Sequence, residues 1–185
     1  MALFVVQIFK TISEKLVYEN KWIKVYENKI IRRGQEGVYG VVRRQDTAVI
    51  IPLTVTNKTV LLKQYRYPTA DFSWELPMGG ILKNESDIEA AKRELVEETG
   101  IKDVTLKQIG SFYAIPGLTP QKVAIFVARL TEEELLLKFT PNTQTDDILS
   151  GKVLDIKDVY HMVVNGEITD GVTLSSLLYL KLHLK

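Results

Sequence analysis

Polar and apolar residues alternate through much of the first 45 positions, as they do in strands that bury one face. A turn at residues 19–21 separates two alternating segments, and a second turn is predicted at residues 34–37. The apolar opening of the chain is too short to cross a bilayer and lacks the basic residues of a signal peptide. The strands predicted here are residues 1–9, 15–18, 22–26 and 38–42. A short antiparallel sheet cannot bury both of its faces alone, so this section must pack against something else.

From residue 46 the pattern changes to longer apolar runs, typical of buried strands, which alternate with segments of helical periodicity. One helix is predicted at residues 155–164. A last helix should begin after Asp170 or Thr169, with a wide apolar face formed by Val172, Leu174, Leu177, Leu178 and Leu182. Strands are predicted at residues 48–55, 59–65, 104–113 and 123–130, and the first and last of these are expected to be buried.

A further helix is predicted between Ser86 and Gly100. Ser86 and Glu89 have the spacing of a capping box, which begins a helix, and Gly100 suits the left-handed residue that ends one. Ile88, Ala91 and Leu95 would then share one apolar stripe that faces the core.

Three acidic residues, Glu94, Glu97 and Glu98, lie beside that stripe on one side of the predicted helix. Like charges at this spacing repel by about 0.2–0.5 kcal/mol per pair, and the helix dipole disfavours negative charge near a C-terminal end. A divalent cation would remove both penalties, and carboxylate oxygens suit Mg²⁺ or Mn²⁺ rather than zinc. The helix alone also fits a solvated acidic face, balanced by Lys92 and Arg93.

Length and composition limit the other possibilities. The 185 residues suit one compact domain with a small addition, and we predict an N-terminal β-sheet section at 1–45 and a main domain at 46–185, in the α/β (α+β) class. A net charge of +1 gives no electrostatic reason to expect nucleic acid or a membrane as partner. The sequence has no cysteine, which excludes disulfides and zinc–thiolate sites. A cytoplasmic location is expected.

The stretch at 79–101 resembles the Nudix box at every specified position, which are Gly79, Glu85, Arg93, Glu94, Leu95, Glu97, Glu98, Gly100 and Ile101. Membership of the Nudix hydrolases would imply an α/β/α sandwich and hydrolysis of a nucleoside diphosphate linked to another group. It would also imply divalent metal, Mg²⁺ or Mn²⁺, held by Glu94 and Glu98 and by the main-chain carbonyl of Met78. Glu97, beside them, would complete or orient this metal shell and so take part in catalysis. Glu85 and Arg93 would orient the helix and the preceding loop.

Three other features of the sequence resemble the ADP-ribose pyrophosphatase branch of this family. They are residues 64–68, residues 74–80 and a proline, Pro116, sixteen residues beyond Gly100. The resemblance implies that Pro116, Gly117 and Leu118 contact substrate. The chain departs from its relatives just after this loop, where it has Pro120 and Gln121 instead of an acidic pair.

The resemblance also implies roles outside the box. The antiparallel N-terminal sheet of this branch commonly exchanges across a homodimer, and an aromatic residue there, here Trp22, stacks on the base in the partner subunit's site. Trp22 would also fit an ordinary core or interface position. Arg66 suits a diphosphate because a planar guanidinium pairs with oxyanions through two hydrogen bonds, although a surface ion pair with Glu75 or Asp71 would also explain it. Asp146 and Asp147 occupy a polar loop where relatives place a glutamate that acts as general base or as an extra metal ligand. They are the candidate general bases, although paired aspartates before an apolar residue are also common in ordinary loops.

The leading hypothesis is therefore a Mg²⁺-dependent enzyme that splits ADP-ribose, or a similar small-molecule nucleoside diphosphate sugar, into a nucleoside monophosphate and a sugar phosphate. A hydrolase that prefers GDP-mannose is one alternative. A non-catalytic nucleotide-sugar sensor is another, although the complete set of box carboxylates argues against it. A hydrolase of damaged nucleoside triphosphates is disfavoured by the β-rich N-terminal section.

Overall fold

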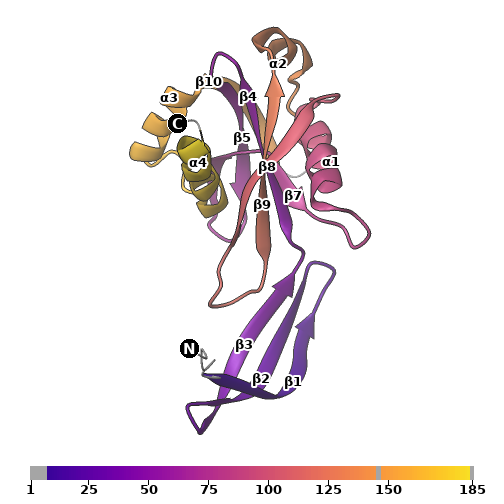
Figure 1. The fold of residues 1–185 in the computed structure, drawn as a ribbon, viewed down its shortest axis with the longest axis vertical. Coiled ribbons are helices and arrows are strands. Elements are labelled where there is room, and N and C mark those ends of the chain that lie inside the picture. Colours follow the sequence, from indigo (N-terminus) through magenta and orange to yellow (C-terminus); the bar gives the residue numbers. More distant parts are fainter. Residues whose placement is uncertain (1–7, 145–146, 184–185) are drawn as a thin grey trace, which may run out of the picture. The chain divides into compact units, whose positions relative to one another are not determined.

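The computed structural model describes residues 8–144 and 147–183 and divides the chain into two compact units. The first unit contains the N-terminal strands and a loop at residues 113–121, and the second contains residues 46–112 and 122–185. Residues 113–121 fall within the main domain predicted at residues 46–185. Their contacts instead group them with the N-terminal strands. Figure 1 shows the elements of both units along the chain.

The first unit is a three-stranded antiparallel sheet in the order β1 (Phe9–Glu19), β2 (Ile23–Arg32) and β3 (Gln35–Arg44). The second turn is tighter than predicted, because Arg32 pairs with Gln35 and the turn is made by residues 33–34 alone. Gly34 adopts φ 82°, which a residue with a side chain rarely adopts. The predicted strand at residues 1–9 lies largely outside the described residues.

The second unit contains two sheets. One has the order β7 (Met78–Gly80), β4 (Thr47–Thr54), β9 (Lys122–Leu130) and β8 (Thr105–Tyr113), and β4 runs parallel to β9. The other has the order β10 (Ile148–Asp155), β5 (Lys58–Arg66) and β6 (Asp71–Glu75). The strands β6, β7 and β10 are not among those predicted from the sequence: β6 and β7 are only five and three residues long, and β10 lacks a clear alternation of apolar and polar residues.

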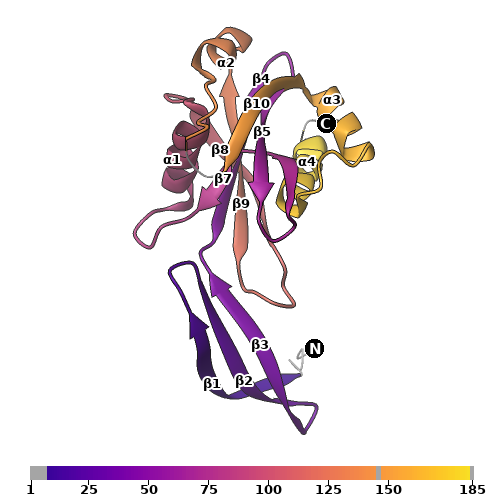
Figure 2. The ribbon, with the colours of Figure 1, turned by 180° about the vertical axis from the view of Figure 1, so that it is seen from behind.

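The helices of the second unit lie on both sides of its sheets, as Figures 1 and 2 show from opposite directions. One side carries α1 (Asp87–Thr99), and the other carries α3 (Ile156–Val164) and α4 (Gly171–His183). A short helix, α2 (Glu132–Lys138), follows β9. This is the α/β/α sandwich expected from the sequence. Within the described ranges, no helix has both the length and the apolar character that a membrane crossing would need.

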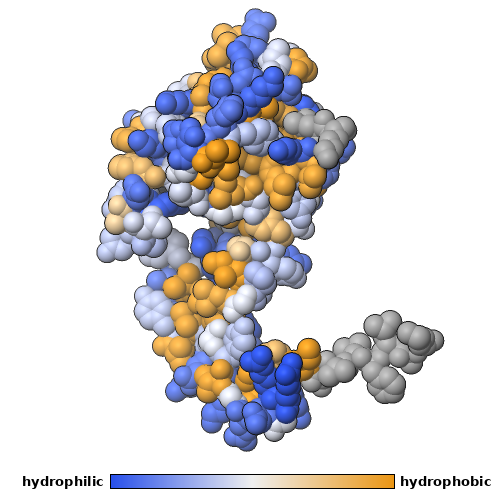
Figure 3. Space-filling model, turned by 90° about the vertical axis from the view of Figure 1, so that its left-hand side faces the viewer, coloured by the Kyte–Doolittle hydropathy of each residue, from blue (hydrophilic) through white to orange (hydrophobic). Residues whose placement is uncertain are grey.

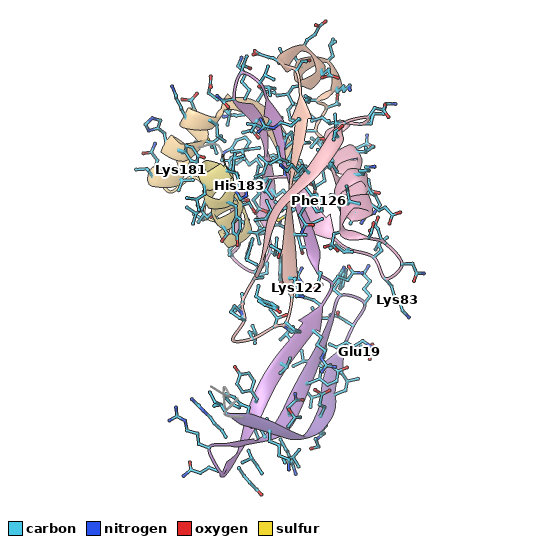
Figure 4. The ribbon with its side chains drawn as sticks, in the orientation of Figure 1. Glu19, Lys83, Lys122, Phe126, Lys181 and His183 are labelled. Atoms are coloured by element: carbon cyan, nitrogen blue, oxygen red, sulfur yellow. The ribbon has the colours of Figure 1, made fainter. Side chains whose placement is uncertain are left out.

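The core under α1 fixes which face of that helix is buried. Ala91 and Leu95 are almost fully buried and pack with Phe126 of β9, which Figure 4 labels. The prediction for Ile88 was wrong, because this side chain is 39% exposed. Ala90 is buried in its place, so the buried face is rotated towards the acidic residues. The last helix shows a similar difference, since Leu178 and Leu182 are exposed.

Candidate functional site

The ends of α1 set the position of the acidic residues. The main-chain N–H of Ser86 donates to the Glu89 carboxylate at 2.8 Å, and Gly100 ends the helix at φ 71°. The N–H of Gly100 donates to the carbonyl of Val96 at 2.9 Å. Both caps have the predicted form, and together they fix the helical register of the carboxylates.

Two of the three glutamates are buried. Glu94 is 7% exposed and Glu98 is 2% exposed, so the protein surrounds two carboxylates one helical turn apart. Each oxygen of Glu98 accepts a hydrogen bond: Oε2 from the main-chain N–H of Met78 at 3.0 Å, and Oε1 from Nε2 of Gln64 at 3.4 Å. Buried carboxylates carry a desolvation penalty unless they are paired or bind a cation.

Glu94 fits closely against β7. A Cβ atom on Gly79 would lie 2.0 Å from Cδ of Glu94, a distance at which one of the two must move. Arg93 Nη1 donates to Glu94 Oε1 at 2.6 Å. The glycine therefore makes the space that Glu94 occupies, and the arginine sets the direction in which its carboxylate faces.

Arg93 ties the helix to the loop before it. It donates from Nε to Glu85 at 2.9 Å and from Nη2 to the carbonyl of Gly80 at 2.9 Å. The Arg93 guanidinium holds the pKa of Glu85 below its ordinary value, and the hydrogen bonds that Arg93 donates to Glu85 raise the pKa of Arg93. Glu97 also accepts from Arg93, at 3.0 Å, but its side chain is 52% exposed.

A second arginine lies at the end of β5. Arg66 donates from Nε to Glu75 at 2.9 Å and from Nη2 to the other oxygen of the same carboxylate. Glu75 is 1% exposed, and burial raises its pKa despite the opposing effect of Arg66. The ion-pair alternative for Arg66 is therefore present in the structure. The pair also fixes the plane of the guanidinium.

The loop before β10 brings one of the candidate bases to this region. The main-chain carbonyl of Asp147 accepts from the N–H of Tyr65 at 3.2 Å, next to Gln64 on β5. Asp147 is exposed and adopts φ 58°, a left-handed conformation that is uncommon for a residue with a side chain. Asp146 lies outside the described residues.

A cavity of about 310 Å³ lies where α1, β5, β7 and the loop before β10 meet. Its lining residues are Gln64, Arg66, Met78, Gly79, Gly80, Glu94, Glu98 and Asp147. The structure thus brings together five predicted site residues from four parts of the chain. Glu97 is not in the lining.

The cavity fits a divalent cation with oxygen ligands. It holds two buried carboxylates and the buried Oε1 of Gln64, which has no hydrogen-bond partner among the described residues. Within the same residues, no three His, Cys, Asp or Glu side chains converge on a point that could hold a metal ion. Two carboxylates still suit Mg²⁺, which commonly takes one or two carboxylates and completes its shell with water and phosphate oxygens.

The other predicted substrate residues belong to the first unit. Pro116, Gly117 and Leu118 line a cavity of about 420 Å³ together with Tyr39 and Arg43. The hydroxyl of Tyr39 donates to the carbonyl of Gly117 at 2.9 Å. This cavity joins the 113–121 loop to the N-terminal sheet within one unit.

Trp22 lies elsewhere on the first unit, directly before β2. Its side chain is 68% exposed, and Nζ of Lys21 lies 4.1 Å from the centre of its ring. A large exposed aromatic side chain is available to stack on a planar group.

Sequence reasoning missed Gln64 and Tyr39 as site residues, and it considered Glu75 only as an ion-pair partner. A strand is predicted at residues 59–65, and a glutamine next to its apolar residues is a polar side chain that could be buried, which is the signal that could have identified Gln64. Nothing in the sequence pattern near Tyr39 indicated that it would face the 113–121 loop.

Comparisons with known proteins agree with this geometry. The NUDIX domain model matches residues 43–170. The ADP-ribose pyrophosphatase of Bacillus subtilis (strain 168) is 28% identical over 174 residues, which cover 94% of this chain and 92% of that protein. The GDP-mannose pyrophosphatase of Yersinia enterocolitica is 29% identical over 147 residues, or 76% of this chain and 75% of that protein.

A solved structure described as an ADP compounds hydrolase has the same fold. It superposes with a TM-score of 0.78 over 96% of this chain and 95% of that chain, at 18% sequence identity. The α/β/α sandwich with an N-terminal sheet section is therefore confirmed as the fold.

Proposed function

The chain belongs to the Nudix family, and on that premise we propose that it hydrolyses the diphosphate of a nucleoside diphosphate sugar, with ADP-ribose as the first candidate. The products would be a nucleoside monophosphate and a sugar phosphate. Relatives named as ADP-ribose and GDP-mannose pyrophosphatases, each aligned over most of the chain, support this substrate class.

The observation that carries the proposal is the cavity between α1 and β5, where buried Glu94 and Glu98 lie in one lining with Arg66. Opposite charges concentrated in one cavity suit a substrate that is itself anionic and binds together with a cation. A surface acidic patch would not need buried carboxylates or a glycine that makes room for one of them.

Nudix hydrolases generally need a divalent metal. In this chain Glu94 and Glu98 would hold it, with the main-chain carbonyl of Met78 as a further oxygen, and we favour Mg²⁺ or Mn²⁺ because all these donors are hard oxygens. When bound, the metal would neutralise diphosphate charge and acidify a water molecule. Glu97 would act beside these ligands through its contact with Arg93.

Arg66 would bind the diphosphate. Its Nε and Nη2 donate hydrogen bonds to Glu75 and hold the guanidinium plane in place. Nη1, at the other edge of that plane, would donate to a phosphate oxygen. Asp147, in the same lining, would take the proton from the attacking water, with Asp146 as the alternative. The left-handed backbone of Asp147 is the kind of strain that clusters at active sites.

The first unit would bind the nucleoside and form a homodimer. Every residue of β1 is exposed, and apolar side chains gather along the N-terminal strands on the face that Figure 3 shows. The exposed large apolar residues there include Phe9, Ile12, Leu16, Val17, Tyr18, Trp22, Val38 and Tyr39. Apolar surface of this extent favours association, with Trp22 and residues 116–118 presented to a base. Sedimentation as a monomer at micromolar concentration would contradict the dimer.

Two alternatives differ in what they require. Preference for GDP-mannose would keep every role above and change only the contacts to base and sugar. A nucleotide-sugar sensor would bind the same ligands without turnover. A cytoplasmic enzyme of nucleotide-sugar turnover remains the best fit, since a pure binder has no use for a candidate base beside two buried carboxylates.

The test is an assay of hydrolysis over a panel of nucleotide sugars and nucleoside triphosphates with Mg²⁺ present. Turnover of a nucleotide sugar supports the proposal and identifies the substrate. Tight binding without turnover of any compound would support the sensor and contradict the enzyme.

A further inference from the structure

Gln64 is the most buried polar side chain of the cavity that does not belong to the Nudix box. It lies on β5, is 2% exposed and faces Glu98 of α1, although the two residues are 34 positions apart in the sequence. Its main chain pairs with Ile148, directly after Asp147. The side chain therefore lies where the helix, β5 and the loop before β10 meet.

The nitrogen and the oxygen of the Gln64 side-chain amide differ in their hydrogen bonding. Nε2 donates to Glu98 Oε1 at 3.4 Å, a long hydrogen bond, whereas Oε1 is fully buried and has no partner among the described residues. The opposite orientation of the amide would point its carbonyl at a carboxylate, with two acceptors facing each other. The orientation found here is thus the one that electrostatics favours.

The partnerless oxygen makes a purely structural role a poor explanation. A buried acceptor without a hydrogen bond costs stability, and an apolar side chain of the same length would fill the position at less cost. A glutamine at this position is explained if its oxygen gains a hydrogen-bond donor when a ligand binds in the cavity.

We propose that Gln64 is a positioning residue for Glu98: its amide N–H holds the Glu98 carboxylate in the orientation that binds a divalent cation, and its Oε1 accepts a hydrogen bond from a water molecule bound to that cation. The main-chain N–H of Met78 donates to the other oxygen of Glu98 at 3.0 Å, so both carboxylate oxygens accept a hydrogen bond. Groups that orient a metal ligand in this way commonly change metal affinity or activity by about 10- to 100-fold when removed. The inference rests on the proposed function, because it concerns the same cation site.

Binding of Mn²⁺ alone, measured by electron paramagnetic resonance on the full chain, tests this without any substrate. Gln64→Met keeps the length of the side chain and removes both hydrogen-bonding ends. We expect it to weaken Mn²⁺ binding about tenfold or more. In a Glu98→Gln background, which removes the carboxylate that Gln64 orients, the same substitution should change the affinity much less.

Thr59→Val is the matched control. Thr59 lies on the same strand and also has a buried oxygen without a partner, but it does not line the cavity. Its substitution should leave Mn²⁺ affinity unchanged. Gln64→Asn is a second test variant, because it keeps the amide but withdraws it by one methylene, and it too should weaken binding.

Two results would overturn the inference: Mn²⁺ affinity that is the same in Gln64→Met and the native chain, or an equal loss with and without the Glu98 carboxylate. If Gln64→Met does not fold, as judged by circular dichroism, the same two criteria apply to Gln64→Asn. Failure of the proposed function has a different signature. A chain that binds Mn²⁺ in a Gln64-dependent way but hydrolyses no nucleotide sugar would contradict the function and leave the inference standing.

Discussion

Gly79 and Glu94 occupy adjoining space so closely that a Cβ atom on the glycine would lie 2.0 Å from Cδ of the glutamate and 2.2 Å from each of its carboxylate oxygens. The Nudix box thus contains a glycine for a reason that is visible in side-chain packing. The position of one buried carboxylate depends on the absence of a side chain on the neighbouring strand.

Gly79→Ala should therefore displace Glu94 and weaken cation binding. We expect a loss of at least about tenfold in Mn²⁺ affinity, as for other changes that misplace a metal ligand, and a larger loss of hydrolysis. Calorimetric titration of Mn²⁺ measures the first effect. Gly171→Ala is the control, because a Cβ there meets nothing within 4 Å. Equal losses in both variants would contradict the explanation.

The Arg66–Glu75 pair predicts a change in substrate binding. Glu75→Gln removes the charge that holds the guanidinium plane while keeping the shape of the side chain. We expect the KM for a nucleotide sugar to rise about tenfold, with a smaller change in kcat, because diphosphate binding is weakened in ground and transition states alike. Asp71→Asn, on the same strand but outside the cavity lining, is the control. A fall in kcat with unchanged KM would argue that Arg66 acts on the chemistry instead.

Asp147 and Asp146 can be separated by kinetics. If Asp147 is the general base, Asp147→Asn should lower kcat by about 10²- to 10⁴-fold with little change in KM. Asp103→Asn is a close control, since Asp103 also adopts a left-handed φ, of 57°, but lies outside the cavity lining. If Asp147→Asn keeps the native kcat and Asp146→Asn loses it, Asp146 and not Asp147 is the general base.

Glu132 predicts a pH dependence of stability that is independent of catalysis. Hydrogen bonds from Lys58 and Thr56 hold the pKa of Glu132 below its ordinary value of 4.5. Because the pKa is lowered on folding, the ionised carboxylate stabilises the folded state above pH 4.5, and this contribution is lost as the pH falls through the lowered pKa.

Glu132→Gln should accordingly lower the urea midpoint at neutral pH, and the difference from the native chain should shrink as the pH falls below 4.5. Urea titrations from pH 7 to about pH 3 would measure this. Glu133→Gln is the control, because Glu133 makes no ion pair among the described residues. A difference that is constant over the whole pH range would contradict the role of the Lys58 pair.

The features that the sequence predicted well are those with a local physical cause. Ser86 and Gly100 act on the backbone within a few residues, so the ends of α1 could be read from spacing alone. The apolar runs that became β4 and β9 are buried along almost their whole length, and such runs are conspicuous in any sequence.

The features that were missed depend on contacts between distant parts of the chain. Ile88 has the spacing of a core residue, but the core lies on the side of α1 that carries Ala90, Glu94 and Glu98. The strand β10 alternates poorly and is held by pairing with β5. The importance of Gln64 follows from its distance to Glu98, which no local pattern could supply.

Buried Glu94 and Glu98 are the residues that, in our proposal, make this chain a metal-dependent hydrolase of nucleotide sugars. The most direct measurement is ³¹P nuclear magnetic resonance of ADP-ribose and GDP-mannose incubated with Mg²⁺ and either the native chain or Glu98→Gln. We expect the native chain to convert at least one diphosphate into two phosphomonoesters, and Glu98→Gln to slow this conversion by orders of magnitude. Diphosphate signals that persist with the native chain, or conversion at the native rate by Glu98→Gln, would contradict the proposal.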